Sequence, residues 1–373
     1  MPSLLKREKF LVLAAIITIA GFFLEHSVLE MGKLAAILAA IALIAVIVLV
    51  STRVAHAAEI LAQKVGDPYG TMILTLSAVA VEVLILAILM NNSESPTLVR
   101  DTIYAAVMLD INGILGLAAL LGGLRHGEQE YNDNSGKTYG VMILTAMGIS
   151  MIVPEFVPAD RWHYYSAFTI CAMIALYALF LRMQVGAHSY FFSYSYPRNK
   201  PASAAGAPPA TGSGQSAQEE PQASAALAIG IILAGVVIIG VLAEFMSAFL
   251  NLGLQGSGAP PALMAVIVAA ISAAPEILTA LRAALRNRMQ ATVNIAMGAS
   301  LSTVILTVPV MEGIALYSGQ PFIMAMTPVQ TVMVIITLIA AAINLNDGET
   351  NAIEGMTHFV LFSTFIMLTI LGL

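Results

Sequence analysis

The sequence predicts an all-α integral membrane protein with eleven transmembrane helices, one N-terminal span plus two inverted five-helix repeats. Hydrophobic residues make up 59% of the chain, charged residues make up only 10%, and the mean hydropathy is +0.88. A soluble domain cannot bury so much apolar surface, so the composition is typical of a membrane protein. Two further observations carry the prediction: the number of long apolar stretches and the uneven placement of basic residues between them.

Apolar stretches of about 20 residues, the length that crosses a hydrocarbon core, occur eleven times along the chain. They are residues 10–24, 34–52, 70–90, 102–124, 138–157, 164–184, 224–250, 261–281, 291–316, 321–344 and 354–372. The first follows a short basic segment and could imitate a signal peptide. Because no small-residue cleavage site follows it, and Glu25 and His26 end it, we interpret residues 1–33 as a retained N-terminal span.

The basic residues predict the orientation. If the N-terminus is inside and the spans alternate, only Lys33, Arg100 and Arg161 of the 16 Lys and Arg residues fall in outer segments. Cytoplasmic segments carry an excess of Lys and Arg. We therefore expect a multi-pass protein of the bacterial inner (plasma) membrane with a cytoplasmic N-terminus and a periplasmic C-terminus.

A polar segment divides the chain. Residues 185–223 include a long run of Pro, Gly, Ser and Ala, which is typical of a flexible cytoplasmic linker. It separates a first repeat at 34–184 from a second at 224–373, each with five predicted spans. An odd number of spans forces the two repeats into opposite orientations. Inverted repeats are an architecture of secondary transporters, whose site lies near the bilayer midplane between the repeats.

The second span of each repeat carries one glutamate at its centre. A Gly/Pro-rich segment leads to it in both cases, G-D-P-Y-G (66–70) before Glu82 and G-A-P-P-A (258–262) before Glu276. A carboxylate at this depth costs at least ~2.5 kcal/mol. The simplest alternative is that each acid pairs with an interior arginine or amide, but no Lys or Arg lies at comparable depth. We therefore predict that both glutamates bind ions or protons.

The predicted chemistry of this pair follows from electrostatics. Two close carboxylates in a low dielectric need protons or a cation to neutralise them, so Glu82 and Glu276 bind protons and a metal cation in competition. Calcium accepts many oxygen ligands in a flexible geometry. Soft metals need His or Cys, which the spans scarcely offer. The expected cargo is Ca²⁺, with Na⁺ or K⁺ as alternatives, and no resident cofactor is predicted.

Residues next to Glu276 are expected to add oxygen ligands. Pro275 has no N–H, so the carbonyl of Ile271 loses its helical partner. Ser272 lies one turn before Glu276 and shares its face. The carbonyl and the hydroxyl would then converge beside the carboxylate. The alternative is that Pro275 only kinks the helix.

Further polar residues lie deep in other spans. Asn294, Gly298 and Ser302 recur every four residues and form one small, polar face, with Thr303 adjacent. Asp110 is a third buried acid, which is either a ligand, a proton relay or an inert protonated group.

Other deep polar residues are more ambiguous. Ser77 either supports the site or bonds to its own backbone. Glu155, Glu244 and Glu312 lie near outer ends of spans, where they would form a vestibule or interfacial charges.

Other functional classes fit less well. The single cysteine, Cys171, excludes an intramolecular disulfide, and the net charge of −6 argues against nucleic-acid binding. An intramembrane enzyme using Asp110 and a glutamate is an alternative, as is a channel or an organic-solute carrier. We find no protease motif, and the acidic, small-residue spans do not suit a large solute. The expected partners are inorganic cations, protons and the lipid bilayer.

Several motifs resemble one family over nearly the whole chain outside the linker. They are G-D-P-Y-G-T-M-I-L-T-L-S-A-V-A-V-E-V (66–83), P-T-L-V-R-D-T-I-Y (96–104), L-L-G-G (120–123), A-P-E (274–276) and N-I-A-M-G-A-S-L-S-T-V-I-L-T-V-P-V (294–310). Together they resemble bacterial calcium/proton and sodium–potassium/proton antiporters of the cation/calcium exchanger superfamily. The resemblance implies two inverted five-helix repeats, each giving one acid, Glu82 and Glu276, to a central ion site that Gly298 and Ser302 face.

The sequence departs from the wider superfamily at these acids. Many relatives have an asparagine shortly before each acid, where this chain reads A-V-A-V-E (78–82) and S-A-A-P-E (272–276). Amide oxygens are ligands there, so the resemblance does not specify the cation.

Overall fold

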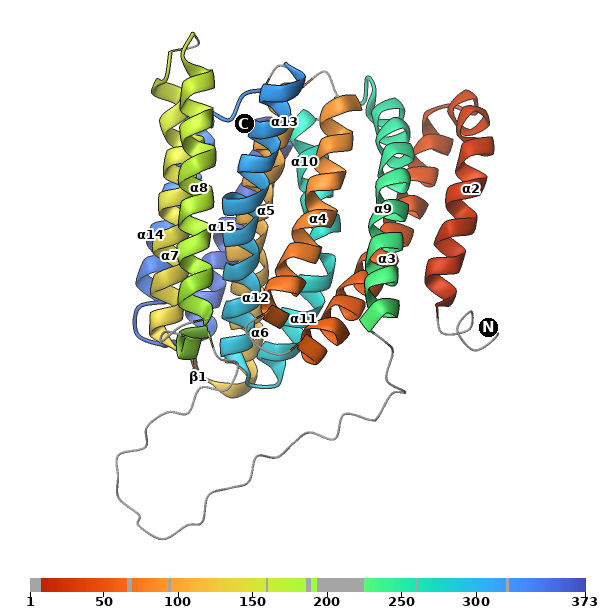
Figure 1. The fold of residues 1–373 in the computed structure, drawn as a ribbon. Helices are drawn as coiled ribbons and strands as arrows, with labels where there is room; N and C mark the ends of the chain where they lie inside the picture. The colour runs from red at the N-terminus through yellow and green to blue at the C-terminus, as the bar shows by residue number, and fades with distance from the viewer. Residues whose placement is uncertain are drawn as a thin grey trace, which may run out of the picture.

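Long helices stand side by side and form an upright bundle (Figure 1). This computed structural model describes residues 8–65, 69–92, 95–158, 160–185, 189–192, 225–258, 260–319 and 322–373. The helices before the linker are α2 (Lys9–Glu30), α3 (Lys33–Val65), α4 (Tyr69–Asn92), α5 (Leu98–Met108), α6 (Gly116–His126), α7 (Asp133–Met147) and α8 (Trp162–Val185). Those after it are α9 (Ala225–Leu254), α10 (Pro261–Ser272), α11 (Ala274–Leu285), α12 (Met289–Ser302), α13 (Val308–Ser318), α14 (Pro328–Asn344) and α15 (Ala352–Ile370).

The bundle has the properties of a multi-pass membrane protein. Within the described residues, eight helices are long and apolar enough to cross a membrane, or up to nine if the bent pair of α10 and α11 is one span. Two shorter apolar helical stretches are Thr75–Asn91, which is part of α4, and Pro328–Asn344, which is α14. The prediction of an all-α membrane protein is therefore confirmed.

Each of the eleven predicted stretches overlaps a helix or a continuous run of helices, although length and composition alone do not fix eleven crossings. The largest differences are at α3, which continues to Val65 rather than ending at residue 52, and at α14, which begins at Pro328 rather than at residue 321. The start of α14 has a local cause, a capping box in which the Thr327 side chain accepts from the Gln330 backbone and Gln330 bonds back to Thr327.

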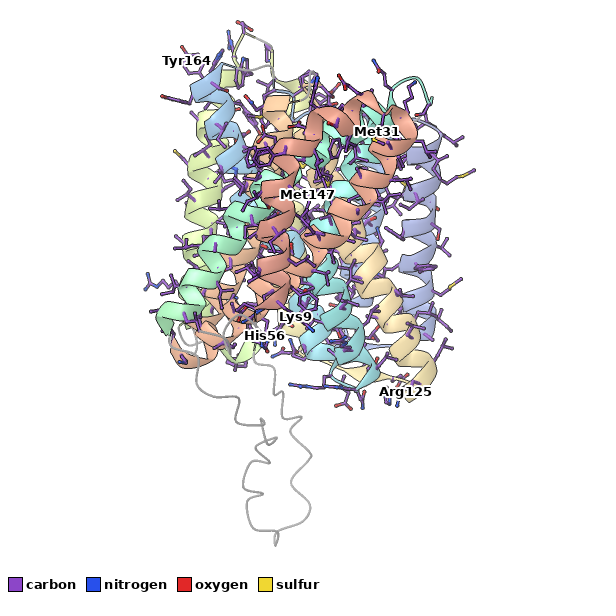
Figure 2. All side chains as sticks on the ribbon, turned by 90° about the vertical axis from the view of Figure 1, so that its right-hand side faces the viewer. Lys9, Met31, His56, Arg125, Met147 and Tyr164 are labelled. Atoms are coloured by element: carbon purple, nitrogen blue, oxygen red, sulfur yellow. The ribbon has the colours of Figure 1, made fainter. Side chains whose placement is uncertain are left out.

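The two ends of the bundle differ. Lys9, His56 and Arg125 lie at one end, whereas Met31 and Tyr164 lie at the other (Figure 2). The C-terminus lies at the end opposite to the start of α2 (Figure 1).

The apolar interior consists of two clusters. One is built mainly from α2, α3 and α9, which stand together on one side of the bundle (Figure 1). The other is built from α5 to α8 and α11 to α15. The helices α4 and α10 contribute side chains to both clusters, for example Ile85 to the first and Leu86 to the second. They therefore lie on the boundary between the clusters.

Three helices are interrupted at mid-length. A π-helical segment, η1 (Leu109–Leu115), joins α5 to α6, and another, η5 (Thr303–Thr307), joins α12 to α13. The third interruption separates α10 from α11, whose axes are bent by 59°. Interruptions of this kind at mid-span are frequent at functional sites. A further π-helical segment, η2 (Gly148–Ile152), and a 3₁₀ turn, η3 (Val153–Phe156), end α7.

Close helix packing depends on small residues, as expected in a membrane bundle. Where α6 crosses α15, a Cβ on Gly355 would clash with the backbone of Ala119 and Leu120. A Cβ on Gly116 would clash with His358. These two glycines bring α15 against the segment that carries Asp110.

Two short strands join the halves of the chain at one end. Strand β1 (Gln129–Glu130) pairs with β2 (Glu349–Thr350) in antiparallel fashion. Most of the predicted linker 185–223 lies outside the described residues. Within it, Ser189–Phe192 form a 3₁₀ turn, η4, in which Phe192 packs against Tyr139 and Phe180.

Candidate ion-binding site

Glu82 lies at the centre of α4 and is buried, with 7% of its surface exposed. Its Oε2 atom accepts hydrogen bonds from Thr303 Oγ1 at 3.1 Å and from Thr307 Oγ1 at 3.0 Å. Its Oε1 atom is buried and has no hydrogen-bond partner. One oxygen of this carboxyl group is thus held by hydroxyls while the other is free to bind an ion.

The two threonines come from η5, the π-helical segment in the middle of the α12–α13 run. Residues four apart on a helix point the same way, so both hydroxyls reach one oxygen of Glu82. Thr303 was predicted next to the site, whereas Thr307 was not. Many apolar helices carry threonines bonded to their own backbone, so the sequence gives no signal that separates Thr307 from them.

Glu276 lies in the first turn of α11, directly after the break at Ala273. Pro275 offers no N–H to the Ile271 carbonyl, which explains why the regular helix stops there. Glu276 is partly exposed, but its Oε2 atom is buried without a hydrogen-bond partner. The positive end of the α11 dipole favours a carboxylate at this position. The break therefore holds a second carboxyl oxygen that is available to an ion.

Asp110 adds a third carboxyl group from η1. Its side chain is 2% exposed and its Oδ2 atom accepts a hydrogen bond from Ser300 Oγ at 3.2 Å. It lies close enough to Glu276 and Glu82 for the charges to repel one another, and Glu276 interacts with Glu82 in the same way. Within the described part of the chain, none of the three acids forms an ion pair with Lys or Arg.

The acids do not form a complete metal cage by themselves. In the described ranges, no group of three His, Cys, Asp or Glu side chains is close enough to hold a metal ion. A bound cation would therefore complete its coordination shell with neutral oxygens, such as threonine hydroxyls and backbone carbonyls at the breaks. This suits a hard cation that is carried through the site.

Several predicted supporting residues point elsewhere. Three hydroxyls donate to carbonyls of their own helix: Ser77 to Ile73, Ser272 to Ala269 and Ser302 to Ala299. These three hydroxyl groups therefore do not donate to Glu82, Glu276 or Asp110.

The polar face predicted on α12 also turns away from the acids. Asn294 donates to the carbonyl of Phe192 and accepts from Gln290. Gly298 faces α7, where a Cβ would lie 3.7 Å from Tyr139 Oη.

A second polar network lies behind Asp110. The Asn112 amide donates to Thr337 Oγ1 at 2.7 Å, and its oxygen lies 2.8 Å from His358 Nδ1. All three side chains are buried, and His358 Nε2 has no partner. This network joins η1 to α14 and α15. No sequence pattern paired these residues, because they come from three separate helices.

A bundle of apolar helices with unpaired acids at mid-span defines a membrane transporter of ions. The chain belongs to the sodium/calcium exchanger family, whose model, described as sodium/calcium exchanger protein, matches residues 35–186 and 227–371. This agrees with the resemblance that the sequence motifs indicated.

Individual relatives and solved structures agree with this assignment. The chain is 32% identical over 334 residues to the sodium-potassium/proton antiporter ChaA of Escherichia coli K12, covering 88% of each protein. It is 25% identical over 323 residues to a Ca²⁺/H⁺ antiporter of Aphanothece halophytica, covering 84% of each. The solved structure of native YfkE superposes with a TM-score of 0.72 at 17% identity, covering 96% of this chain and 99% of YfkE. At that identity the last likeness shows the fold alone.

Proposed function

We propose that this chain is a cation/proton antiporter that exports Ca²⁺, or Na⁺ or K⁺, in exchange for protons by alternating access. The observation that carries the proposal is the pair of buried glutamate oxygens, Glu82 Oε1 and Glu276 Oε2, which lack hydrogen-bond partners. Their carboxyl groups also repel each other. The relatives named as sodium-potassium/proton and Ca²⁺/H⁺ antiporters support the exchange. As a member of an exchanger family, the chain is a transporter and not an enzyme.

In this mechanism, protons and the cation compete for the same oxygens. A cytoplasmic cation displaces protons from Glu82 and Glu276, the protein rearranges, and periplasmic protons displace the cation outward. One Ca²⁺ balances two carboxylates, as do two protons, so the charge of the loaded pair stays constant. Thr303 and Thr307 keep one oxygen of Glu82 in place. Asp110 acts as a third ligand or as a relay for protons.

We also propose the finer architecture expected from the sequence. It comprises eleven spans in the bacterial plasma membrane, repeats at 34–184 and 224–373, a cytoplasmic N-terminus and a periplasmic C-terminus. The family model matches the chain twice, once on each side of the linker, which supports the repeat. The occurrence of π-helical segments in the third helix of each half supports it as well.

Transport in inverted membrane vesicles tests this function. Uptake of Ca²⁺, Na⁺ and K⁺ driven by an imposed proton gradient is measured for the wild type and for Glu82→Gln and Glu276→Gln. Each substitution removes a charge that the cation needs, so we expect both to abolish exchange. Glu244→Gln, at an exposed glutamate on α9, is the matched control and should transport normally. Full exchange by either buried-acid variant would contradict the mechanism.

A further inference from the structure

A fourth acid, Glu312, is buried away from the central site. The sequence placed it near the outer end of a span as a vestibule or interfacial charge. In the structure it lies on α13 with only 1% of its surface exposed, against α8. Its Oε1 atom lies 3.3 Å from Ser166 Oγ and 3.2 Å from Thr169 Oγ1. The Thr169 hydroxyl also lies 2.9 Å from the Tyr165 carbonyl of its own helix, to which it can donate while it accepts a hydrogen bond from a protonated Glu312. Its Oε2 atom is buried and has no partner.

The surroundings of Glu312 repeat those of Glu82. In both cases two hydroxyls from one neighbouring element lie within hydrogen-bonding distance of a single carboxyl oxygen, and the other oxygen is buried and unpaired. A buried carboxylate whose second oxygen has no hydrogen-bond donor is unfavourable as a bare charge. It therefore needs a positively charged ligand, either a proton or a cation, to neutralise it.

Among the residues that the structure describes, no Lys or Arg forms an ion pair with Glu312. The elements packed against α13 are α8, α4 and η5. The titratable group that α8 places near Glu312 is Tyr165, whose hydroxyl donates to the Ile149 carbonyl. The titratable side chain of the described part of α4 near η5 is Glu82, which bonds to the two threonines of that segment and not to Glu312. The η5 segment has no titratable side chain. On α13 itself, Tyr317 is exposed to 95%.

The ligand is a proton rather than a metal cation. A metal ion would need several further oxygen ligands. Glu82 has the carboxyl groups of Asp110 and Glu276 nearby, whereas among the described residues Glu312 interacts with no second acid and has only two hydroxyls beside it. A proton needs only one oxygen, and the protonated group can donate to either hydroxyl. We propose that Glu312, with Ser166 and Thr169, is a second proton-binding site that is separate from the Glu82–Glu276 pair and does not bind the transported cation.

The position of Glu312 determines where its proton exchanges. It lies six residues before the end of α13 at Ser318, about 9 Å along the helix axis. Ser166 lies in the second turn of α8, which begins at Trp162 at the same end of the bundle. In the orientation of the proposed function this is the periplasmic end, so the proton exchanges with the periplasm. Only this last statement depends on the proposed function.

Infrared spectroscopy of the purified full-length protein at neutral pH tests the second site. A protonated carboxyl group gives a C=O stretching band that an ionised group lacks. We expect the band of Glu312 to disappear in Glu312→Gln, to shift in the more conservative Glu312→Asp, and to persist in Glu155→Gln. Glu155 is an exposed acid of the η3 turn at the same end and serves as the control.

Titration with Ca²⁺ separates the second site from the central one. Adding Ca²⁺ should remove the bands of protonated central acids and leave the Glu312 band unchanged. The protons released by Ca²⁺ should be equal in number for wild type and Glu312→Gln. Identical spectra for wild type and both Glu312 variants, or loss of the Glu312 band with Ca²⁺, would overturn the proposal. If Ca²⁺ changes no band at all, the central mechanism fails, while the comparison of variants still decides the role of Glu312.

Discussion

At the scale of single residues, the acceptor of each hydroxyl group distinguishes the residues that bond to Glu82 from those that bond to their own helix. Ser77 and Ser302 donate to their own helices, as most hydroxyls in apolar helices do. Thr303 and Thr307 instead donate across the interface to Glu82. A hydroxyl that gives up the bond to its own helix gains a charged acceptor, and this makes the stronger hydrogen bond. We therefore expect the threonines to stabilise the ionised form of Glu82, which is the form that would bind a cation.

Replacing Thr307 with valine tests this stabilisation. A hydrogen bond to a charged group contributes about 1.5–3 kcal/mol, so Thr307→Val should raise the half-saturating cation concentration roughly tenfold or more. The measurement is the concentration dependence of transport at constant pH. Thr364→Val is the matched control, since Thr364 is exposed on α15 and donates to its own helix. An unchanged half-saturating concentration in Thr307→Val would show that this bond does not support cation binding.

Thermal unfolding at different pH values tests the competition between protons and the cation. A ligand that binds only the folded state stabilises it by about 2.7 kcal/mol at a concentration 100 times its Kd. Protons occupy the same oxygens, so we expect protection by Ca²⁺ to weaken as the pH falls and to strengthen as it rises. Glu276→Gln should lose most of the protection at every pH. Protection that stays constant across the pH series would exclude a shared site.

The sequence indicated which acids are buried more readily than it indicated which side chains form hydrogen bonds with one another. Glu82 and Glu276 stood out because a lone carboxylate in an apolar stretch is rare, and Asp110 for the same reason. The contact of Asn112 with His358 had no such signal, because it depends on how α15 packs against η1. Glu312 lies near the end of a helix as expected, but the interpretation as a vestibule or interfacial charge does not agree with its 1% exposure. Distance along a span gives no information on burial by a neighbouring helix.

At the scale of helices, the breaks matter more than the spans. The apolar stretches predicted where the helices lie, and Pro275 indicated the break between α10 and α11. The π-helical segments η1 and η5 were not predicted, since one extra residue in a helical turn leaves the apolar pattern almost unchanged. The η1 segment carries the acid Asp110, and the η5 segment carries the two threonines that bond to Glu82.

Replacing Pro275 with alanine tests the importance of the α10–α11 break. Alanine restores an N–H for the Ile271 carbonyl and favours a continuous helix. Glu276 would then lie inside that helix and no longer in the first turn of α11. We expect Pro275→Ala to lose transport without a lower melting temperature. In the control, Pro328→Ala, the proline occupies the first position of α14, where the N–H is not needed. Normal transport by Pro275→Ala would show that the break is not required.

At the scale of the whole molecule, the fold and its membrane class were predictable because composition and apolar length constrain them strongly. The pattern of Lys and Arg added an orientation. The division of the interior into two apolar clusters was not predictable, since it depends on which helix faces are in contact.

Cysteine labelling tests the orientation. The chain has a single cysteine, Cys171, which is exposed, so a Cys171→Ser background gives a cysteine-free protein. Tyr164→Cys and Arg125→Cys then place one thiol at each end of the bundle (Figure 2). In intact spheroplasts, a membrane-impermeant maleimide should label Tyr164→Cys and leave Arg125→Cys unlabelled until the cells are lysed. The reverse pattern would invert the proposed topology.

The pairing of β1 with β2 has a mechanical consequence. Main-chain hydrogen bonds such as Tyr131 N–H to the Gly348 carbonyl at 2.8 Å fasten the α6–α7 and α14–α15 connections together. Burial, reinforced by nearby carboxylates such as Asp347, raises the pKa of Tyr131, so its hydroxyl keeps donating to the carbonyls of Asn344 and Glu349. In the described ranges, this sheet ties only the larger cluster.

The helices α3 and α9 belong to the other cluster and pack largely through apolar side chains, which can slide without breaking hydrogen bonds. We therefore expect any sliding between the two clusters to occur along α4 and α10, the helices that contribute to both, and α4 carries Glu82.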